Sequence, residues 1–259
     1  MLLTCVRKHG MTAEFDEYAS NYDAGMNHPL KAILGSSAKS YLHPKAVWVV
    51  NYLAYLKRNQ KCKGQGAVRL LEVGCGIGSF LECLHLNHFT GELYGADTSK
   101  LMLEQAKKNC EHAIFSPTFS LIESCLLPYP DGFFEIVVAC ALLHHVQPGD
   151  RKKMFDEFKR VLVPGGVLVV FEHNPWNLVT QIVVRTTAID KHAKLLSANH
   201  VRELAVKSGF SIDREEYMMF FPPRWSFLSG VEKFLVRFPF GGQFAIAGRT
   251  PEGNFKKTF

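Results

Sequence analysis

The amino-acid sequence predicts an α/β protein with a doubly wound, Rossmann-like sheet of seven strands, mostly parallel with an antiparallel last strand. Three observations support this fold class. From residue 69 onward, short apolar runs alternate with segments whose apolar residues recur at helical spacing. Several runs are β-branched and continuously apolar, as is typical of strands buried on both faces of a parallel sheet. The chain of 259 residues is 47% hydrophobic, which is enough to bury a core of that size.

Two helices are expected before the first strand. The first is predicted from apolar residues at i, i+3, i+4 and i+7, namely Phe15, Tyr18, Ala19 and Tyr22. The second is expected to follow His43, because Pro44 suits the first turn of a helix. We therefore divide the chain into an N-terminal extension with two helices at 1–66 and a core domain at 67–259.

Strands and helices are expected to alternate through the core domain. The predicted strands are 69–73, 92–97, 118–123, 134–140, 167–172, 210–221 and 243–248. The predicted helices cover about 79–88, 99–109, a segment that ends before Pro164, 198–209 and 227–238. Residues 173–197 have no clear period and are interpreted as an insertion after the fifth strand. Ligands of such a sheet bind at the carboxyl ends of its strands.

Charge and cysteine usage narrow the classes of partner and compartment. The net charge is +6, but lysines and arginines are interleaved with acids, so no basic stripe predicts a nucleic-acid partner. The cysteines are odd in number and lack a C-x-x-C pair; they are Cys5, Cys62, Cys75, Cys83, Cys110, Cys125 and Cys140. This pattern predicts reduced thiols in the cytoplasm and no metal site. No apolar run approaches the roughly 18 residues of a membrane-spanning helix.

The loop after the first strand carries glycines at every second position, in Gly74-x-Gly76-x-Gly78. This is neither the G-x-G-x-x-G of dinucleotide sites nor a phosphate loop with its lysine. Glu72 would repel a pyrophosphate and favour an ammonium group, and Asp97 ends the next strand, where an acid can bind a ribose diol. S-adenosylmethionine has a ribose, an ammonium group and no phosphate. The simpler alternatives are a tight turn for the glycines and a helix cap for Asp97, a cap that Thr98 or Ser99 could supply instead.

Four stretches in the expected order strengthen this interpretation. They are 70-LLEVGCGIGSF-80, 94-YGADTSKLMLEQAKK-108, 127-LPYPDGFFEIVVACALLHHV-146 and 160-RVLVPGGVLVVFE-172. Together they resemble the successive motifs of class I S-adenosylmethionine-dependent methyltransferases, of the small-molecule type found in ubiquinone and menaquinone biosynthesis. The similarity covers roughly residues 14–172, and the order of the last elements is similar to the family's terminal hairpin.

The resemblance implies a set of cofactor-binding residues. Gly74, Cys75, Gly76 and Gly78 would form the loop against the cofactor, with Glu72 at its methionine end and Asp97 with Thr98 at its ribose. Glu123 and Ser124 would meet the adenine, Cys140 and Ala141 would line the cofactor's edge, and Tyr22 resembles an aromatic lid residue. The N-terminal helices would then act as a lid, and S-adenosylhomocysteine would be the product.

Three histidines are candidates for a general base. His144 and His145 follow the fourth strand and His173 follows the fifth, so all three should lie near the carboxyl edge of the sheet. The L-H-H-V pattern is frequent in the family whatever the substrate, which argues that one of the pair is structural. Residues 172–177 (EHNPWN) are similar to an Asn-Pro-Pro-aromatic motif of amino-group methyltransferases. We reject that function because the motif belongs after the fourth strand. Asn174-Pro175 is interpreted as a turn that leaves the sheet, or Glu172, His173 and Asn174 as a polar floor of the substrate pocket.

The helix expected at 227–238 has an apolar stripe, which we expect to dock on the sheet. As an alternative, residues 220–240 would cap an apolar substrate or contact a membrane surface. The sequence thus predicts methyl transfer from S-adenosylmethionine to a small molecule, either apolar or amphipathic like a quinone or lipid, or a sugar precursor. The alternatives are a non-catalytic cofactor-binding protein and an NAD-dependent oxidoreductase. The oligomeric state is not predicted.

Overall fold

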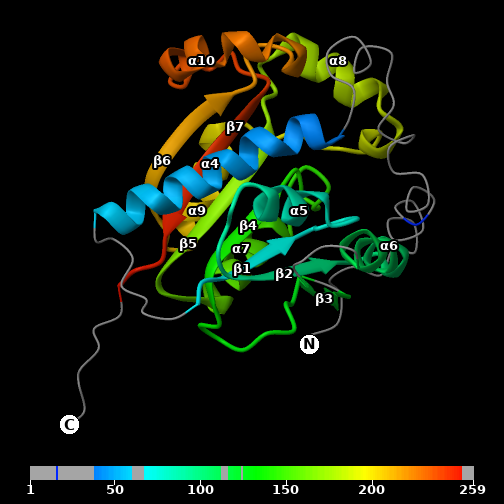
Figure 1. Cartoon of the computed structure of the whole chain (residues 1–259), viewed down its shortest axis with the longest axis vertical. Helices are drawn as coiled ribbons and strands as arrows, with labels where there is room; N and C mark the ends of the chain where they lie inside the picture. The colour runs from blue at the N-terminus through cyan, green and yellow to red at the C-terminus, as the bar shows by residue number, and fades with distance from the viewer. Residues whose placement is uncertain (1–15, 17–37, 60–66, 112–115, 124, 253–259) are drawn as a thin grey trace.

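The computed structural model describes residues 16, 38–59, 67–111, 116–123 and 125–252. Within them the chain forms one seven-stranded sheet with the order β3-β2-β1-β4-β5-β7-β6 (Figure 1). The strands are β1 (Arg69–Val73), β2 (Glu92–Asp97), β3 (Thr118–Leu121), β4 (Phe134–Cys140), β5 (Leu162–His173), β6 (Ser211–Met218) and β7 (Gln243–Arg249). Neighbouring strands are parallel except that β7 runs antiparallel to both β5 and β6. The predicted fold class is confirmed.

Helices cover both faces of the sheet (Figure 1). Apolar side chains of α4 (Ala38–Arg58) and α5 (Ser79–Leu86) share one buried cluster with the sheet. Those of α7 (Arg151–Val161) and α9 (Ala198–Lys207) share a second cluster on the opposite face. The helix α6 (Lys100–Cys110) contacts β2 and β3. Both faces of the central strands are therefore buried, which explains why their sequences are continuously apolar.

The bounds of β1, β2, β4 and α5 follow the sequence closely, whereas β5 begins five residues earlier than predicted. Leu162 already pairs with Phe134, and the register then shifts before Ile136 pairs with Val167. This irregularity accommodates Pro164, which lacks the N–H that a regular ladder would need. Gly165 there has a φ of +75°, a conformation that favours glycine.

The second N-terminal helix also starts earlier than predicted. It begins at Ala38 and contains Pro44 in its interior instead of its first turn. The lost hydrogen bond is offset by burial, because Tyr52 and Leu56 of α4 are fully buried against the sheet. Trp48 also donates a hydrogen bond from Nε1 to Glu216 of β6 at 2.6 Å. The first predicted helix, except for Asp16, lies outside the described residues, and the division between 66 and 67 stays a prediction.

The insertion at 173–197 contains regular structure that the sequence pattern did not predict. It includes α8 (Leu178–Thr186) and a short 3-10 helix, η2 (Ala188–Asp190). The N-terminus of α8 is capped by Asn177, whose Oδ1 accepts a hydrogen bond from the Thr180 N–H at 2.9 Å. Because α8 packs at the end of β5 and not across the sheet, three of its apolar residues are exposed.

The expectation that the stripe at 227–238 docks on the sheet is wrong for most of its residues. The segment forms η3 (Pro223–Leu228) and α10 (Ser229–Leu235), with a kink at Trp225. Phe227 and Phe234 are 79% and 83% exposed. The physical reason is that α10 is only seven residues long and lies beyond the end of the sheet, where it contacts β6 on one side (Figure 1).

Five of the cysteines fall within the described residues; all five are buried, and none of them is in a disulfide. They are Cys75, Cys83, Cys110, Cys125 and Cys140. The prediction of reduced thiols holds for these five. Among the helices of the described chain, none is both long enough and apolar enough to cross a membrane.

Candidate functional site

The glycine loop lies at the carboxyl end of β1, where it crosses the end of β2. The N–H groups of Gly74 and Cys75 both donate to the Ala96 carbonyl, at 2.7 and 3.1 Å. Gly74 and Gly76 have φ values of +76° and +49°, but their surroundings differ. A Cβ on Gly74 would lie 2.8 Å from Leu142 Cδ1, whereas one on Gly76 would meet nothing within 4 Å. The loop therefore exposes backbone at Gly76 to open space, as a ligand that contacts the main chain requires.

Asp97 joins the end of β2 to this loop. Its Oδ2 accepts from the Gly76 N–H at 2.8 Å and its Oδ1 from the Ser99 N–H at 2.9 Å. Burial raises the pKa of Asp97, while these hydrogen bonds and one from the Thr98 backbone oppose the rise. The cap of α6 is supplied by Ser99, whose Oγ accepts from the Met102 N–H at 3.1 Å. Asp97 is therefore not needed as a helix cap.

Glu72 has an unsatisfied carboxylate oxygen at this edge of the sheet. Its side chain is buried, and its Oε2 has no hydrogen-bond partner among the described residues. Burial and the nearby Asp97 raise the pKa of Glu72 well above its usual range, and Lys45 opposes them. An unpartnered buried carboxylate costs stability unless a ligand completes it. The position of Glu72 therefore fits the ammonium group of S-adenosylmethionine.

Lys45 is a residue of this site that the sequence did not indicate. It lies on α4, is 2% exposed, and donates a hydrogen bond from Nζ to Cys140 Sγ at 3.3 Å. Burial raises the pKa of Cys140 to about 11, so the thiol is neutral at pH 7. Lys45 had no motif to mark it, because it reaches the carboxyl edge only through the packing of α4 on the sheet.

The other predicted cofactor residues are placed as follows. Ala141 directly follows β4, has a φ of +55°, and donates from its N–H to the Phe171 carbonyl at 2.8 Å. A positive φ in a residue with a Cβ is strained and is concentrated at functional sites. Glu123 lies in an exposed bend beyond β3. Ser124 and Tyr22 lie outside the described residues, so their assignments stay predictions.

A buried ion pair lies at the ends of β4 and β5. Glu172 places Oε2 2.6 Å from His144 Nδ1, and its Oε1 accepts from the Leu143 N–H at 2.6 Å. Burial alone lowers the pKa of His144, but Glu172 and Asp190 outweigh it and raise this pKa to about 9. Burial alone would raise the pKa of Glu172, but His144 lowers it to about 2. At pH 7 the pair is an imidazolium held by a carboxylate.

Asp190 brings the second histidine into the same cluster. Its Oδ1 lies 3.6 Å from His144 Nε2 and 3.5 Å from His145 Nε2. Burial lowers the pKa of His145, and it lowers that of His173 to about 3, so both rings are neutral at pH 7. His145 keeps 18% of its side chain exposed, against 1% for His144. Asp190 was missed because it lies in η2, inside the insertion that had no clear period.

The same cluster contains the one group of side chains, among those described, whose geometry could hold a metal ion. The ligand atoms of His144, His145 and Asp190 all lie within 4.8 Å of one another. Spacing could not indicate this group, because Asp190 is far from the histidine pair in sequence. The protonated His144 already supplies a positive charge between Glu172 and Asp190, so the cluster needs no cation to balance its charge.

Asn174 is used by the fold. Its Nδ2 donates to the Pro239 and Gly241 carbonyls at 3.0 and 2.8 Å, and its Oδ1 accepts from the Trp176 N–H at 3.1 Å. These contacts favour the interpretation of residues 174–177 as a turn that leaves the sheet, and they leave Asn174 no part in a polar floor.

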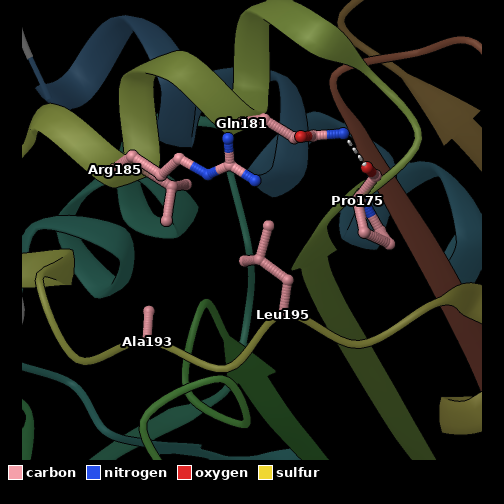
Figure 2. A pocket seen from close by; sticks show the side chains of 6 residues that line it. Pro175, Gln181, Arg185, Ala193 and Leu195 are labelled. Atoms are coloured by element: carbon pink, nitrogen blue, oxygen red, sulfur yellow. Dashed lines mark hydrogen bonds between the residues drawn. The ribbon is translucent and has the colours of Figure 1, made fainter.

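A cavity of about 330 Å³ lies beneath α8. Figure 2 shows Gln181 and Arg185 of α8 above it and Leu195 projecting into it from the chain that follows η2. Gln181 donates from Nε2 to the Pro175 carbonyl at 2.7 Å, which fixes one wall. The Lys194 N–H donates to the His144 carbonyl at 2.8 Å, so the cavity borders the histidine cluster.

Comparison with known proteins agrees with this geometry. Residues 71–170 match a family model described as a methyltransferase domain. The chain is 33% identical over 107 residues to demethylmenaquinone methyltransferase from Thermus thermophilus, covering 41% of this chain and 48% of that protein. It is 28% identical over 116 residues to norajmaline N-methyltransferase from Rauvolfia serpentina, covering 42% and 37%. Each match spans less than half the length of the curated relative.

A solved structure extends the likeness to nearly the whole fold. A S-adenosylmethionine-dependent methyltransferase from Thermotoga maritima superposes with a TM-score of 0.61 at 17% identity, covering 93% of this chain and 100% of that one. The sheet order and the acid-flanked glycine loop define a Rossmann-like cofactor-binding domain. Residues 71–170 thus match a methyltransferase domain, and the fold of the chain is that of S-adenosylmethionine-dependent methyltransferases. The family resemblance in the sequence is confirmed.

The two glycines of the loop should respond differently to alanine. Gly74→Ala combines a left-handed φ with a clash against Leu142, and we expect it to lower the free energy of unfolding by about 2 kcal/mol or more. Gly76→Ala has room for its Cβ, so about 1 kcal/mol is expected, together with a loss of S-adenosylhomocysteine affinity. Chemical denaturation and calorimetric titration measure both. Equal affinity in Gly76→Ala and the unmodified chain would contradict ligand approach at Gly76.

The His144–Glu172 pair should make stability depend on pH. Because the folded state raises the pKa of His144 from 6.5 to about 9, its contribution is complete below pH 6.5 and is lost as the pH rises through 9. We expect His144→Gln to lower the free energy of unfolding at pH 6.5 by about 3 kcal/mol, a deficit that shrinks toward pH 10. Urea unfolding at several pH values tests this, with the exposed His200→Gln as control. A deficit independent of pH would show that His144 is neutral.

Proposed function

We propose that this protein transfers the methyl group of S-adenosylmethionine to a small amphipathic molecule bound beneath α8. The observation that carries the proposal is the unpartnered Oε2 of Glu72, close in sequence to Gly76, whose backbone faces open space. The cavity and the histidine cluster lie farther along the same edge of the sheet, where the strands have their carboxyl ends. The cofactor side lies at β1 and β2, and the acceptor side lies at β4 and β5. The two halves of the edge suit the two substrates.

On the cofactor side, three charged residues have distinct roles. Asp97 holds the ribose hydroxyls, Glu72 the ammonium group, and Lys45 the carboxylate of the methionine part. When bound, the cofactor supplies a methyl group already activated on a positively charged sulfur. The chain therefore has to align the acceptor with that methyl group and exclude water, which the insertion at 173–197 serves.

On the acceptor side, we assign the base to His145 among the three candidates. Asp190 fixes the ring through Nε2, and the ring is neutral at pH 7 and partly exposed. It can accept the proton of an acceptor hydroxyl while that oxygen forms the new bond to the methyl carbon. The electrons of the broken carbon–sulfur bond would stay on sulfur, so the cofactor would leave as S-adenosylhomocysteine with an uncharged thioether. His144 holds Glu172 and is assigned a structural role.

The walls of the cavity support an amphipathic acceptor. Val184, Ala193 and Leu195 are apolar, while Arg185 and Gln181 offer donors on one side (Figure 2). A quinone-like or lipid-like molecule with one polar end matches such a lining, and the menaquinone precursor named for the Thermus relative is of this kind. A sugar precursor fits the apolar wall less well.

Incubation with methyl-labelled S-adenosylmethionine and a cell extract tests the proposal. We expect label in the organic-solvent fraction. Label confined to the aqueous fraction would favour a sugar precursor as the acceptor. Label in the acid precipitate would show that the acceptor is a protein or an RNA and would contradict the proposal. Cofactor binding with no labelled product in any extract would favour the non-catalytic alternative. Binding of NADH without S-adenosylhomocysteine would favour an oxidoreductase.

Asp97→Ala should weaken the binding of S-adenosylhomocysteine by one to two orders of magnitude, because it removes both ribose acceptors and the partner of Gly76. Lys45→Met should weaken it by about tenfold, since it removes the cation for the carboxylate. Isothermal titration measures both. The control is Glu111→Gln, an exposed acid at the end of α6, which should leave affinity unchanged. Unchanged affinity in Asp97→Ala would show that the ribose assignment is wrong.

His145→Gln should reduce turnover of a hydroxyl acceptor by roughly two to four orders of magnitude while leaving the affinity for S-adenosylhomocysteine unchanged. Asp190→Asn should act in the same direction, less strongly. In the unmodified enzyme, protonation of His145 should lower the rate as the pH falls below 6.5, because its pKa is below the ordinary value. His200→Gln is the control. A His145→Gln enzyme with the unmodified rate and pH profile would assign the base elsewhere.

A further inference from the structure

Exposed apolar side chains are concentrated at one end of the molecule. Of the sixteen large hydrophobic side chains that are exposed in the described chain, four lie between residues 176 and 182 and six between 225 and 240. We call this surface the α8–α10 face; it is formed by the start of α8, by η3 and α10, and by the chain after α10. Isolated exposed hydrophobic residues are ordinary, but ten on two segments are not.

The two segments lie together at the same end of the structure (Figure 1). Asn177 donates from Nδ2 to the Phe240 carbonyl at 2.7 Å, which fixes the start of α8 against the chain after α10. Asn174 makes a second hydrogen bond between the two segments, from its Nδ2 to the Pro239 carbonyl at 3.0 Å. Trp176 and Leu178 on one segment and Phe240 on the other are each more than 60% exposed. The apolar side chains therefore continue from one segment to the next.

Exposed apolar residues recur along η3, α10 and the bend that follows α10. Val231 and Phe234 lie on one side of α10, three residues apart, with Phe227 in η3 before them and Phe238 after the helix. Leu228 and Leu235, on the inner side, are half-buried. The segment therefore packs on the protein with one side and presents aromatic side chains with the other.

The charges around this face are mainly positive. Arg185, Lys233 and Arg237 are exposed. Glu232 is the one acid in these two stretches of sequence, and its Oε1 accepts from the Phe221 N–H at 3.0 Å. Aromatic side chains bordered by three cations and one carboxylate are complementary to an anionic lipid surface.

We propose that the α8–α10 face docks the protein on a membrane whose surface carries anionic lipids. A bilayer suits this face better than a protein partner does, because Phe227 and Phe234 project outward and are about four-fifths exposed. Such side chains insert among lipid headgroups, whereas a protein partner would need matching pockets. Docking goes beyond the proposed function, since it concerns where the enzyme works. The cavity lies directly beneath α8, so a docked enzyme would receive an acceptor from the bilayer.

Sedimentation with lipid vesicles tests docking without any methyl transfer. The full chain is mixed with vesicles of phosphatidylcholine alone or with about one third phosphatidylserine, at low and high salt. We expect binding to the anionic vesicles that weakens with salt and is at least tenfold weaker to the neutral ones. The double variant Phe227→Glu with Phe234→Glu should lose at least tenfold in binding. Lys233→Glu with Arg237→Glu should lose binding at low salt in particular.

A matched control separates the face from general hydrophobicity. Leu126 is 65% exposed outside this face, so Leu126→Glu should bind vesicles like the unmodified chain. Titration with S-adenosylhomocysteine in every variant shows whether the protein is folded and reports on the cofactor site independently. If the protein binds S-adenosylhomocysteine but does not bind vesicles, the membrane-docking proposal is wrong and the proposed function is unaffected. A dimer that the phenylalanine variants convert to monomer, with no vesicle binding, would instead assign the face to a second copy.

Discussion

The burial of carboxylates at the ends of parallel strands is the constraint on which this structure depends. Glu72 is the next-to-last residue of β1, Asp97 ends β2 and Glu172 is the next-to-last residue of β5, in a sheet that is covered on both faces. Each carboxylate loses water on folding and needs a donor or a cation in exchange. Asp97 obtains backbone N–H groups, and Glu172 obtains an imidazolium. Glu72 has the charge of Lys45 nearby, but its Oε2 has no hydrogen-bond partner among the described residues and marks the place where a ligand is required.

The different solutions for Glu72 and Glu172 divide the edge into two kinds of environment. The Glu172–His144 pair is complete in the protein alone and holds the loop after β4 in place through the Leu143 N–H. Such a pair contributes rigidity more than net stability, because desolvation offsets much of the attraction. The Glu72 side is incomplete and therefore suited to binding. A rigid acceptor side and an incomplete cofactor side suit an enzyme that must align a nucleophile with a bound methyl donor.

The sheet and its glycine loop were predictable because their signals are local. Runs such as 134–140 are apolar on both faces, and a parallel sheet is the structure that buries such runs. The positions of Glu72 and Asp97 relative to the loop follow from strand length alone. Lys45 and Asp190 were not predictable, because they reach the site through the packing of α4 and of the insertion. Periodicity identifies which side of an element is buried, and it does not identify the distant elements that meet there.

The apolar stripe at 227–238 shows a second limit of sequence periodicity. Its spacing correctly indicated a helix with one apolar side, but spacing cannot say whether that side faces the core or the exterior. The core-facing interpretation is wrong here because α10 lies beyond the end of β6, the edge strand of the sheet, and is too short to fold back over it. An apolar helix at a sheet edge keeps its exposed aromatic side chains only if exposure is tolerated or used. The same insertion that supplies Asp190 to the histidine cluster also supplies Trp176 and Leu178 to this face, so a contact made by α8 outside the protein would act on the walls of the acceptor cavity.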